Sequence, residues 1–211
     1  MILFTNWKQS RAERRDTLSL LALVSAAMIA STAPSNAAAA EKLPGDPAPL
    51  TATDFRLLDE VRLGLASHNL SSKERGEVDI SLAFLTSPLP VSTGNALADF
   101  VFGPRLEVGG SLNSGGDTSF LYAGLTWDVD ITESLFLEAT LGGAVNNGKD
   151  ATPGRIDMGC RVTFREAANL GYRFNEHWQM LVGVEHLSHA GLCDGGNDGL
   201  TNAGVRVGYR F

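Results

Sequence analysis

Apolar and polar residues alternate along the last segment of the chain. Counting back from Phe211, every second residue as far as Ala203 is apolar or aromatic, and the residues between them are polar or small. A period of two is the period of a β-strand, whose successive side chains point to opposite faces. The pattern therefore predicts a final strand over residues 200–211 with one apolar and one polar face.

Similar alternation recurs upstream and predicts an all-β fold. The expected strands cover residues 60–68, 77–85, 104–113, 119–130, 134–145, 160–174, 179–188 and 200–211. Strands with one apolar and one polar face suit the wall of a membrane barrel, and an even number of strands returns both chain ends to the same side. We therefore predict an eight-stranded antiparallel transmembrane β-barrel over residues 56–211, placed in the outer membrane with both ends in the periplasm.

The N-terminal residues predict export. Basic residues precede a short apolar run at residues 18–30, and the small-residue sequence SNA at residues 35–37 offers a cleavage site. This is the organisation of a secretory signal peptide, so residues 1–37 are expected to be removed. The proline-rich residues 38–55 are expected to form a periplasmic leader before the barrel.

The remaining chain is incompatible with other membrane architectures. No apolar run after the signal peptide approaches the ~18 residues that a helical span needs. At ~9–11 residues per strand plus loops, the chain suits about eight strands and cannot form a wide porin. Aromatic residues at the expected periplasmic strand ends fit a girdle at one membrane interface; they are Trp127, Phe174, Trp178, Tyr209 and Phe211.

The polar faces of the expected strands carry charges of both signs. The inward-facing set comprises Arg62, Arg105, Arg161, Arg165, Arg173, Arg206 and Arg210 with Asp79, Glu107, Asp128, Glu138 and Glu185. Side chains fill the lumen of so narrow a barrel, so these charges are expected to pair in a buried network rather than line a pore. Transport is therefore disfavoured. A soluble lipocalin-like barrel is the alternative, but such barrels direct apolar residues inward.

Composition excludes several function classes. The formal net charge is −7, and loss of the signal peptide, with four basic and two acidic residues, makes the chain more acidic. Such a chain is a poor partner for nucleic acid. No glycine-rich phosphate loop leads from a strand into a helix, and the four histidines do not form a ligand cluster. We expect no metal and no cofactor.

One histidine and one serine fall on the apolar face of the seventh expected strand. His186 and Ser188 are two positions apart, so both share the parity that faces lipid, where polar groups are costly. Residues i and i+2 lie ~6.6 Å apart on one strand face, so the imidazole can reach the hydroxyl. An imidazole that takes the proton of a serine hydroxyl activates it as a nucleophile. The pair indicates acyl transfer or ester hydrolysis.

The segment HLSHAGL at residues 186–192, followed by NDG at residues 197–199, resembles the lipid A 3-O-deacylase (PagL-like) family, whose pattern is H-x-S-N-A-G-L and then N-x-G. The resemblance extends more loosely over most of the barrel. It implies an eight-stranded outer-membrane barrel with a serine hydrolase site at the outer leaflet. It further implies Ser188 as nucleophile and His186 as base, with Asn197 and the backbone near Gly191 in the oxyanion hole.

The chain departs from the family pattern at two positions. His189 stands where the family has Asn, and Thr201 stands where an acid is expected at the start of the last strand. Register offers a substitute acid. If a turn at residues 175–177 joins the sixth and seventh strands, Glu166 lies across from His186 on the same face and can orient the imidazole. A rim carboxylate that reaches headgroup-level water is the other interpretation of Glu166, and Asp194 and Asp198 are loop alternatives for the acid.

The same register places Cys160 opposite Leu192, next to Cys193. These are the chain's two cysteines, and the compartment of an exported protein is oxidising. We therefore expect a disulfide that ties the loop after Ser188 to the sixth strand.

Together, these observations predict an outer-membrane serine esterase that removes the 3-O-linked acyl chain from lipid A of lipopolysaccharide. Its expected partners are lipopolysaccharide in the outer leaflet and, during biogenesis, the barrel-assembly machinery. The sequence does not decide between a monomer and a homodimer. The alternatives are a non-catalytic small barrel with a structural or adhesive role, and an outer-membrane phospholipase.

Overall fold

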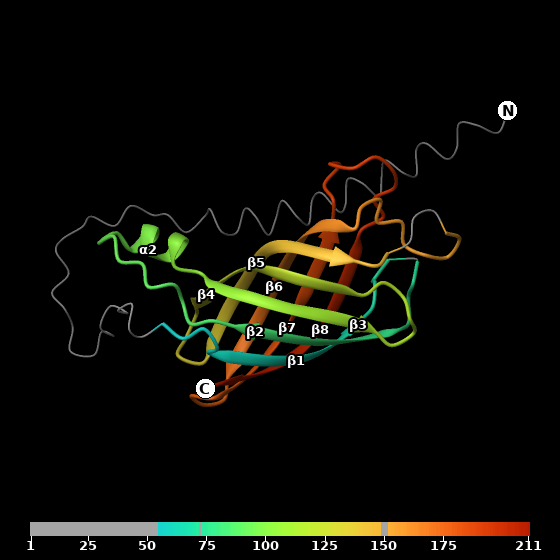
Figure 1. Ribbon diagram of the computed structural model, residues 1–211. Coiled ribbons are helices and arrows are strands. Elements are labelled where there is room, and N and C mark those ends of the chain that lie inside the picture. The colour runs from blue at the N-terminus through green and yellow to red at the C-terminus, as the bar shows by residue number, and fades with distance from the viewer. Residues whose placement is uncertain (1–54, 72, 149–151) are drawn as a thin grey trace. The chain divides into compact units, whose positions relative to one another are not determined.

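The structure is a computed structural model that describes residues 55–71, 73–148 and 152–211 (Figure 1). The chain divides into two units, Met1–Pro47 and Ala48–Phe211, and every described residue belongs to the second. The expected signal peptide at residues 1–37 and all of the expected leader except residue 55 lie outside the described residues, so both stay predictions.

The described chain forms a closed antiparallel barrel in which each strand pairs with its neighbours in sequence and the last pairs with the first. Its elements are β1 (Glu60–Ser67), β2 (Val78–Leu85), α2 (Ala96–Phe102), β3 (Arg105–Asn113), β4 (Phe120–Asp130), β5 (Leu135–Asn146), β6 (Val162–Arg173), β7 (Trp178–Ser188) and β8 (Leu200–Arg210). The eight predicted strands are confirmed with small shifts at their ends. The short helix α2 was not predicted.

The wall of the barrel is apolar outside and polar inside. In β2, the outward residues Ile80 and Leu82 are 54% and 42% exposed. Asp79, which alternates with them, is buried in the lumen. The same alternation holds in the other strands, so apolar side chains surround the barrel. Exposed apolar surface of this extent is stable only in an apolar medium, which is the bilayer for a closed barrel.

Ion pairs fill the lumen. The guanidinium of Arg62 is buried and contacts Glu60 at 2.5 Å and Glu138 at 2.7 Å. On the next layer, Arg165 and Arg206 meet Glu185 at 2.9 and 3.0 Å. Buried charges need such partners, because removal from water costs several kcal/mol per ion. The predicted lumenal network is thus confirmed, and it occupies the space that a pore would need.

Arg161 is an exception to the predicted lumenal set. It is exposed, because β6 begins at Val162 and leaves Arg161 in the preceding loop.

The two ends of the barrel differ. One end has the turns at residues 131–134 and 174–177 together with the C-terminus, and the opposite end has the loops at residues 68–77, 114–119, 147–161 and 189–199 (Figure 1). Short turns mark the periplasmic end of outer-membrane barrels and longer loops the extracellular end. Aromatic rings cluster at the short-turn end, where Tyr209 packs against Trp178 and Phe211 with ring centroids 5.0 and 5.4 Å apart. Within the described ranges, no helix is long and apolar enough to cross a membrane.

Candidate active site

β7 directs His186 and Ser188 to the outer face of the barrel, at the end that carries the long loops. Glu185 and Leu187, which alternate with them, are buried in the lumen at 5% and 0% exposure. Val184, on the same face as His186, is 46% exposed to the surrounding medium, whereas His186 and Ser188 are half-buried. The strand parity predicted for this pair is therefore present.

His186 lies in the middle of a row of polar residues that crosses three strands. Glu166 of β6 pairs with it on one side and Thr201 of β8 on the other. A hydrogen bond of 2.8 Å joins His186 Nδ1 and Thr201 Oγ1. The hydroxyl of Thr201, at the position where the resemblance implies an acid, therefore holds the imidazole at Nδ1, and no residue in the described ranges forms a hydrogen bond with Nε2.

The register predicted for Glu166 is correct, but its contact with His186 is not formed. Among the residues that the structure describes, the carboxylate of Glu166 makes no hydrogen bond or ion pair. Of the loop alternatives, Asp198 is engaged elsewhere: it accepts hydrogen bonds from Lys73 Nζ at 2.6 Å and from the backbone N–H of Asp157 at 2.8 Å. The role of Glu166 as orienting acid stays a prediction.

The hydroxyl of Ser188 makes no hydrogen bond to His186, or to any other residue in the described part of the chain. Catalytic hydrogen bonds are often long in the absence of substrate and form only in the complex. Ser188 pairs across the sheet with Phe164, whose ring is 47% exposed on the outer face. The hydroxyl therefore borders an apolar surface on which an acyl chain can lie.

Gly199 makes room for the imidazole. Its φ of +70° lies in the left-handed region, and a Cβ added there would approach His186 Cε1 to 2.9 Å. Both the backbone conformation and the space therefore require glycine. Neither Gly199 nor Thr201 was predicted as a site residue from sequence, although both stood out: Gly199 closes the NDG segment, and Thr201 marks the missing acid.

His189 organises the loop that follows Ser188. It is buried at 3% exposure, and its Nδ1 accepts hydrogen bonds from the backbone N–H groups of Gly191 and Cys193 at 3.2 and 3.4 Å. Its Nε2 meets the carbonyl oxygen of Gly196 at 3.2 Å. The N–H of Gly191, expected near the oxyanion hole, is therefore already used within the loop.

Asn197 is held next to the serine. Its Oδ1 accepts a hydrogen bond of 3.3 Å from the backbone N–H of His189, the residue that follows Ser188. The side-chain NH2 makes no hydrogen bond within the described ranges. An amide fixed by its oxygen, with its donor free, suits the stabilisation of an oxyanion.

A disulfide connects this loop to the barrel. Cys160 and Cys193 are bonded, with 6.1 Å between their Cα atoms, as the register between β6 and β7 led us to expect. The bond ties the loop just before β6 to the middle of the loop at residues 189–199.

Two groups of described residues have ligand atoms close enough together to hold a metal: Cys160, His189 and Cys193 form one, and His68, Glu74 and Asp117 form the other. In the first group both sulfurs are in the disulfide. In the second, the guanidinium of Arg155 already pairs with both carboxylates. Neither donor set suits a cation in this state.

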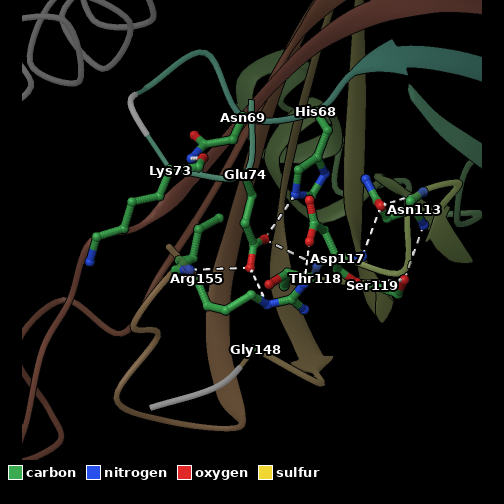
Figure 2. A network of polar contacts seen from close by, with 12 residues as sticks. His68, Asn69, Lys73, Glu74, Asn113, Asp117, Thr118, Ser119, Gly148 and Arg155 are labelled. Atoms are coloured by element: carbon green, nitrogen blue, oxygen red, sulfur yellow. Dashed lines mark hydrogen bonds and ion pairs between the residues drawn. The ribbon is translucent and has the colours of Figure 1, made fainter. Parts of the chain in front are cut away.

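The second group belongs to a buried network at the same end of the barrel (Figure 2). His68 is fully buried between two carboxylates, with Nδ1 at 2.9 Å from Asp79 and Nε2 at 3.1 Å from Glu74. Burial alone would lower the pKa of His68, but hydrogen bonds and charge attraction from both carboxylates raise it. Glu74 also accepts backbone hydrogen bonds from Thr118 and Ile156, each 3.1 Å long. One buried carboxylate thus joins three loops.

Asn69 connects this network to the candidate site. Its Oδ1 accepts a hydrogen bond from the N–H of Thr201 at 3.4 Å, and the N–H of Leu70 donates to the carbonyl oxygen of Thr201 at 2.8 Å. The loop at residues 68–77 therefore fixes the backbone of the residue whose hydroxyl holds His186.

Comparisons with known proteins identify the family and support the fold. The family model of lipid A 3-O-deacylase (PagL) matches residues 59–210. The crystal structure of the outer membrane enzyme PagL superposes with a TM-score of 0.54 at 19% identity, over 72% of this chain and 99% of that one. A de novo designed transmembrane β-barrel is also similar, with a TM-score of 0.44 and 14% identity over 73% of this chain and 95% of that one. The outer membrane protein Ail of Yersinia pestis has a TM-score of 0.40 and 13% identity over 72% of this chain and 99% of that one. No curated protein matches. Because the family match covers nearly the whole barrel, the chain is an outer-membrane β-barrel that belongs to the lipid A 3-O-deacylase (PagL) family.

Proposed function

We propose that this protein is a serine esterase that removes the 3-O-linked acyl chain from lipid A in the outer leaflet. The observation that carries the proposal is the placement of His186 and Ser188 on the lipid-facing side of β7, with the imidazole held at Nδ1 by Thr201. A site on the outer wall can receive an ester from a lipid that diffuses laterally against the barrel.

The proposed reaction has two halves. Ser188 Oγ attacks the ester carbonyl carbon while His186 Nε2 takes the hydroxyl proton, and the side-chain amide of Asn197 stabilises the oxyanion. The tetrahedral intermediate expels the sugar oxygen, which receives the proton from His186. Water then attacks the acyl-serine with His186 again as base, and a hydroxy-fatty acid leaves.

Two residues flank the imidazole in this proposal. Thr201 holds the ring at Nδ1, and the base is the tautomer in which Nδ1–H donates to the threonine hydroxyl and Nε2 is free to take a proton. Glu166, one strand away on the other side, supplies the negative charge that balances the imidazolium. A neutral hydroxyl stabilises an imidazolium less than a carboxylate does, because charge-assisted hydrogen bonds are about twice as strong as neutral ones. The proposal therefore needs Glu166 during turnover even though no hydrogen bond joins the two side chains at rest.

Mass spectra of lipid A test the proposal. Cells that express the protein are expected to lose one 3-hydroxyacyl chain per lipid A, and Ser188→Ala is expected to abolish the loss. Ser67→Ala is a matched control, because Ser67 is also on the outer face near the extracellular end, in β1, and is expected to leave the spectrum of the active protein unchanged. An unchanged lipid A spectrum with the native protein would favour a structural barrel, and release of lysophospholipid would favour a phospholipase.

A further inference from the structure

The connection between β2 and β3 is unlike the other turns at its end of the barrel. The turns at residues 131–134 and 174–177 are short, as is usual at the periplasmic end, whereas residues 86–104 form a long excursion that contains α2 (Figure 1). A backbone hydrogen bond of 3.0 Å from Leu89 N–H to the carbonyl oxygen of Pro104 closes the base of this excursion.

Apolar side chains cover most of the surface of α2. None of its residues is buried, and Leu97, Phe100, Val101 and Phe102 are 41–63% exposed. Asp99 is the one charged residue in residues 86–104. At 3.6 residues per turn, Asp99 points away from the face that Leu97 and Phe100 share. An exposed, nearly uncharged apolar helix is unfavourable in water, so this face requires an apolar environment.

Polar contacts are concentrated on the other side of the helix. The side chain of Asn95 caps the N-terminus by accepting a hydrogen bond from Ala98 N–H at 3.1 Å. Asp99 accepts hydrogen bonds from the backbone N–H and the hydroxyl of Thr93, at 2.6 and 2.7 Å. These contacts hold the helix and its single charge in place without covering the apolar face.

A tryptophan of the barrel wall shows on which side of the wall α2 lies. The indole Nε1 of Trp127 in β4 donates a hydrogen bond of 3.2 Å to the carbonyl oxygen of Val101. Trp127 points outward, because its neighbour Thr126 is fully buried in the lumen and Val129, on the Trp127 face, is 49% exposed. The end of α2 is therefore fixed against the lipid-facing wall and not beneath the lumen.

We propose that residues 86–104 form a membrane-interface anchor whose helix α2 lies in the inner leaflet of the outer membrane, with Leu97 and Phe100 among phospholipid acyl chains. The surface that α2 presents continues the lipid-facing wall of β4, at the level of the aromatic girdle. Tryptophan prefers that level, and a helix with one exposed apolar face buries that face at the boundary between headgroups and acyl chains. This inference depends on the barrel's place in the membrane and not on the proposed reaction.

Spin-label accessibility tests the anchor. The protein is purified from outer membranes and reconstituted in vesicles of phosphatidylethanolamine and phosphatidylglycerol, with a nitroxide on Leu97→Cys or Phe100→Cys. The native cysteines are in a disulfide and do not react without reductant. Leu137→Cys, outward on β5, is the lipid control, and Glu133→Cys, exposed in the turn at residues 131–134, is the water control.

Both labels on α2 are expected to collide with oxygen, which partitions into lipid, as the Leu137→Cys label does, and to be several-fold less accessible to a water-soluble nickel chelate than the Glu133→Cys label. Nickel accessibility equal to that of the Glu133→Cys label would overturn the proposal. Protection from both reagents would also overturn it, because a protein partner or a second copy would then cover the helix. A difference in gel mobility between unheated and heated protein, equal to that of the native protein, verifies that each variant is folded.

Discussion

Replacement of Thr201 by valine removes the hydrogen bond to His186 and almost nothing else. Valine has nearly the shape of threonine, and the backbone contacts of this residue with Asn69 and Leu70 do not involve the side chain. The hydroxyl contact is 2.8 Å long and neutral on the threonine side. A net hydrogen bond of this kind contributes about 0.5–1.5 kcal/mol.

If the whole of that free energy orients the imidazole in the transition state, the rate of lipid A deacylation falls about twofold to thirteenfold in Thr201→Val. Loss of a true triad carboxylate costs about 10⁴-fold in kcat. The magnitude therefore separates a positioning hydroxyl from the principal orienting group. In the same series, Glu166→Gln is expected to cost at least about 100-fold if Glu166 balances the imidazolium, and Thr201→Glu is expected to offset part of that loss.

The assay follows release of 3-hydroxy-fatty acid from lipopolysaccharide in mixed micelles, with initial rates over a range of substrate concentrations. Thr201→Ser is the matched control, since it keeps the hydroxyl and should retain most of kcat. A kcat of Thr201→Val equal to that of the native enzyme would refute the argument that this hydrogen bond holds the base, as would a Thr201→Ser variant as slow as the valine variant.

Three further predictions concern the surroundings of the site. Gly199→Ala should reduce deacylation at least tenfold because its Cβ would strike the candidate base, whereas Gly154→Ala, also at positive φ but with open space around it, should retain activity in the same assay. The thermal stability of the protein, followed by gel migration, should fall as pH rises through the raised pKa of His68, because the two carboxylate partners stabilise the protonated imidazole. This contribution is fully present below the ordinary histidine pKa. His68→Gln should remove the dependence of stability on pH in this range. Replacement of Cys160 and Cys193 by serine should lower the free energy of unfolding by about 3–4 kcal/mol, measured in urea at equilibrium, and an unchanged midpoint would show that the loop needs no covalent tether.

The alternation of side chains along the strands and one short turn were enough to predict much of the candidate site. Alternation alone placed His186 and Ser188 on the outer face, because a strand shows consecutive side chains to opposite sides. The tight turn between β6 and β7 set the register that put Glu166 opposite His186 and brought Cys160 near Cys193. These are local properties, so they can be counted along the chain.

The alternation of residues along the chain did not predict the helix α2 or the exposed position of Arg161. Residues 96–102 are too few for a helical period to be recognised among apolar neighbours, and their helix is supported by a cap and by contact with a distant tryptophan. By its position in the sequence, Arg161 would face the lumen. However, β6 begins only at Val162, so Arg161 lies in the loop that holds Cys160, where the alternation of a strand no longer applies.

By itself, the sequence determined the barrel, the face on which the strand residues lie, and the shared outer face of His186 and Ser188. Only the tertiary structure decided which group holds the imidazole. The loop between β7 and β8 spans residues 189–199, and no turn rule relates the two strands across such a length. The pairing of His186 with Thr201 depends on how that loop closes, through the disulfide, the imidazole of His189 and the neighbouring loop at residues 68–77. Those contacts join segments far apart in the chain, and their geometry exists only once the barrel has closed.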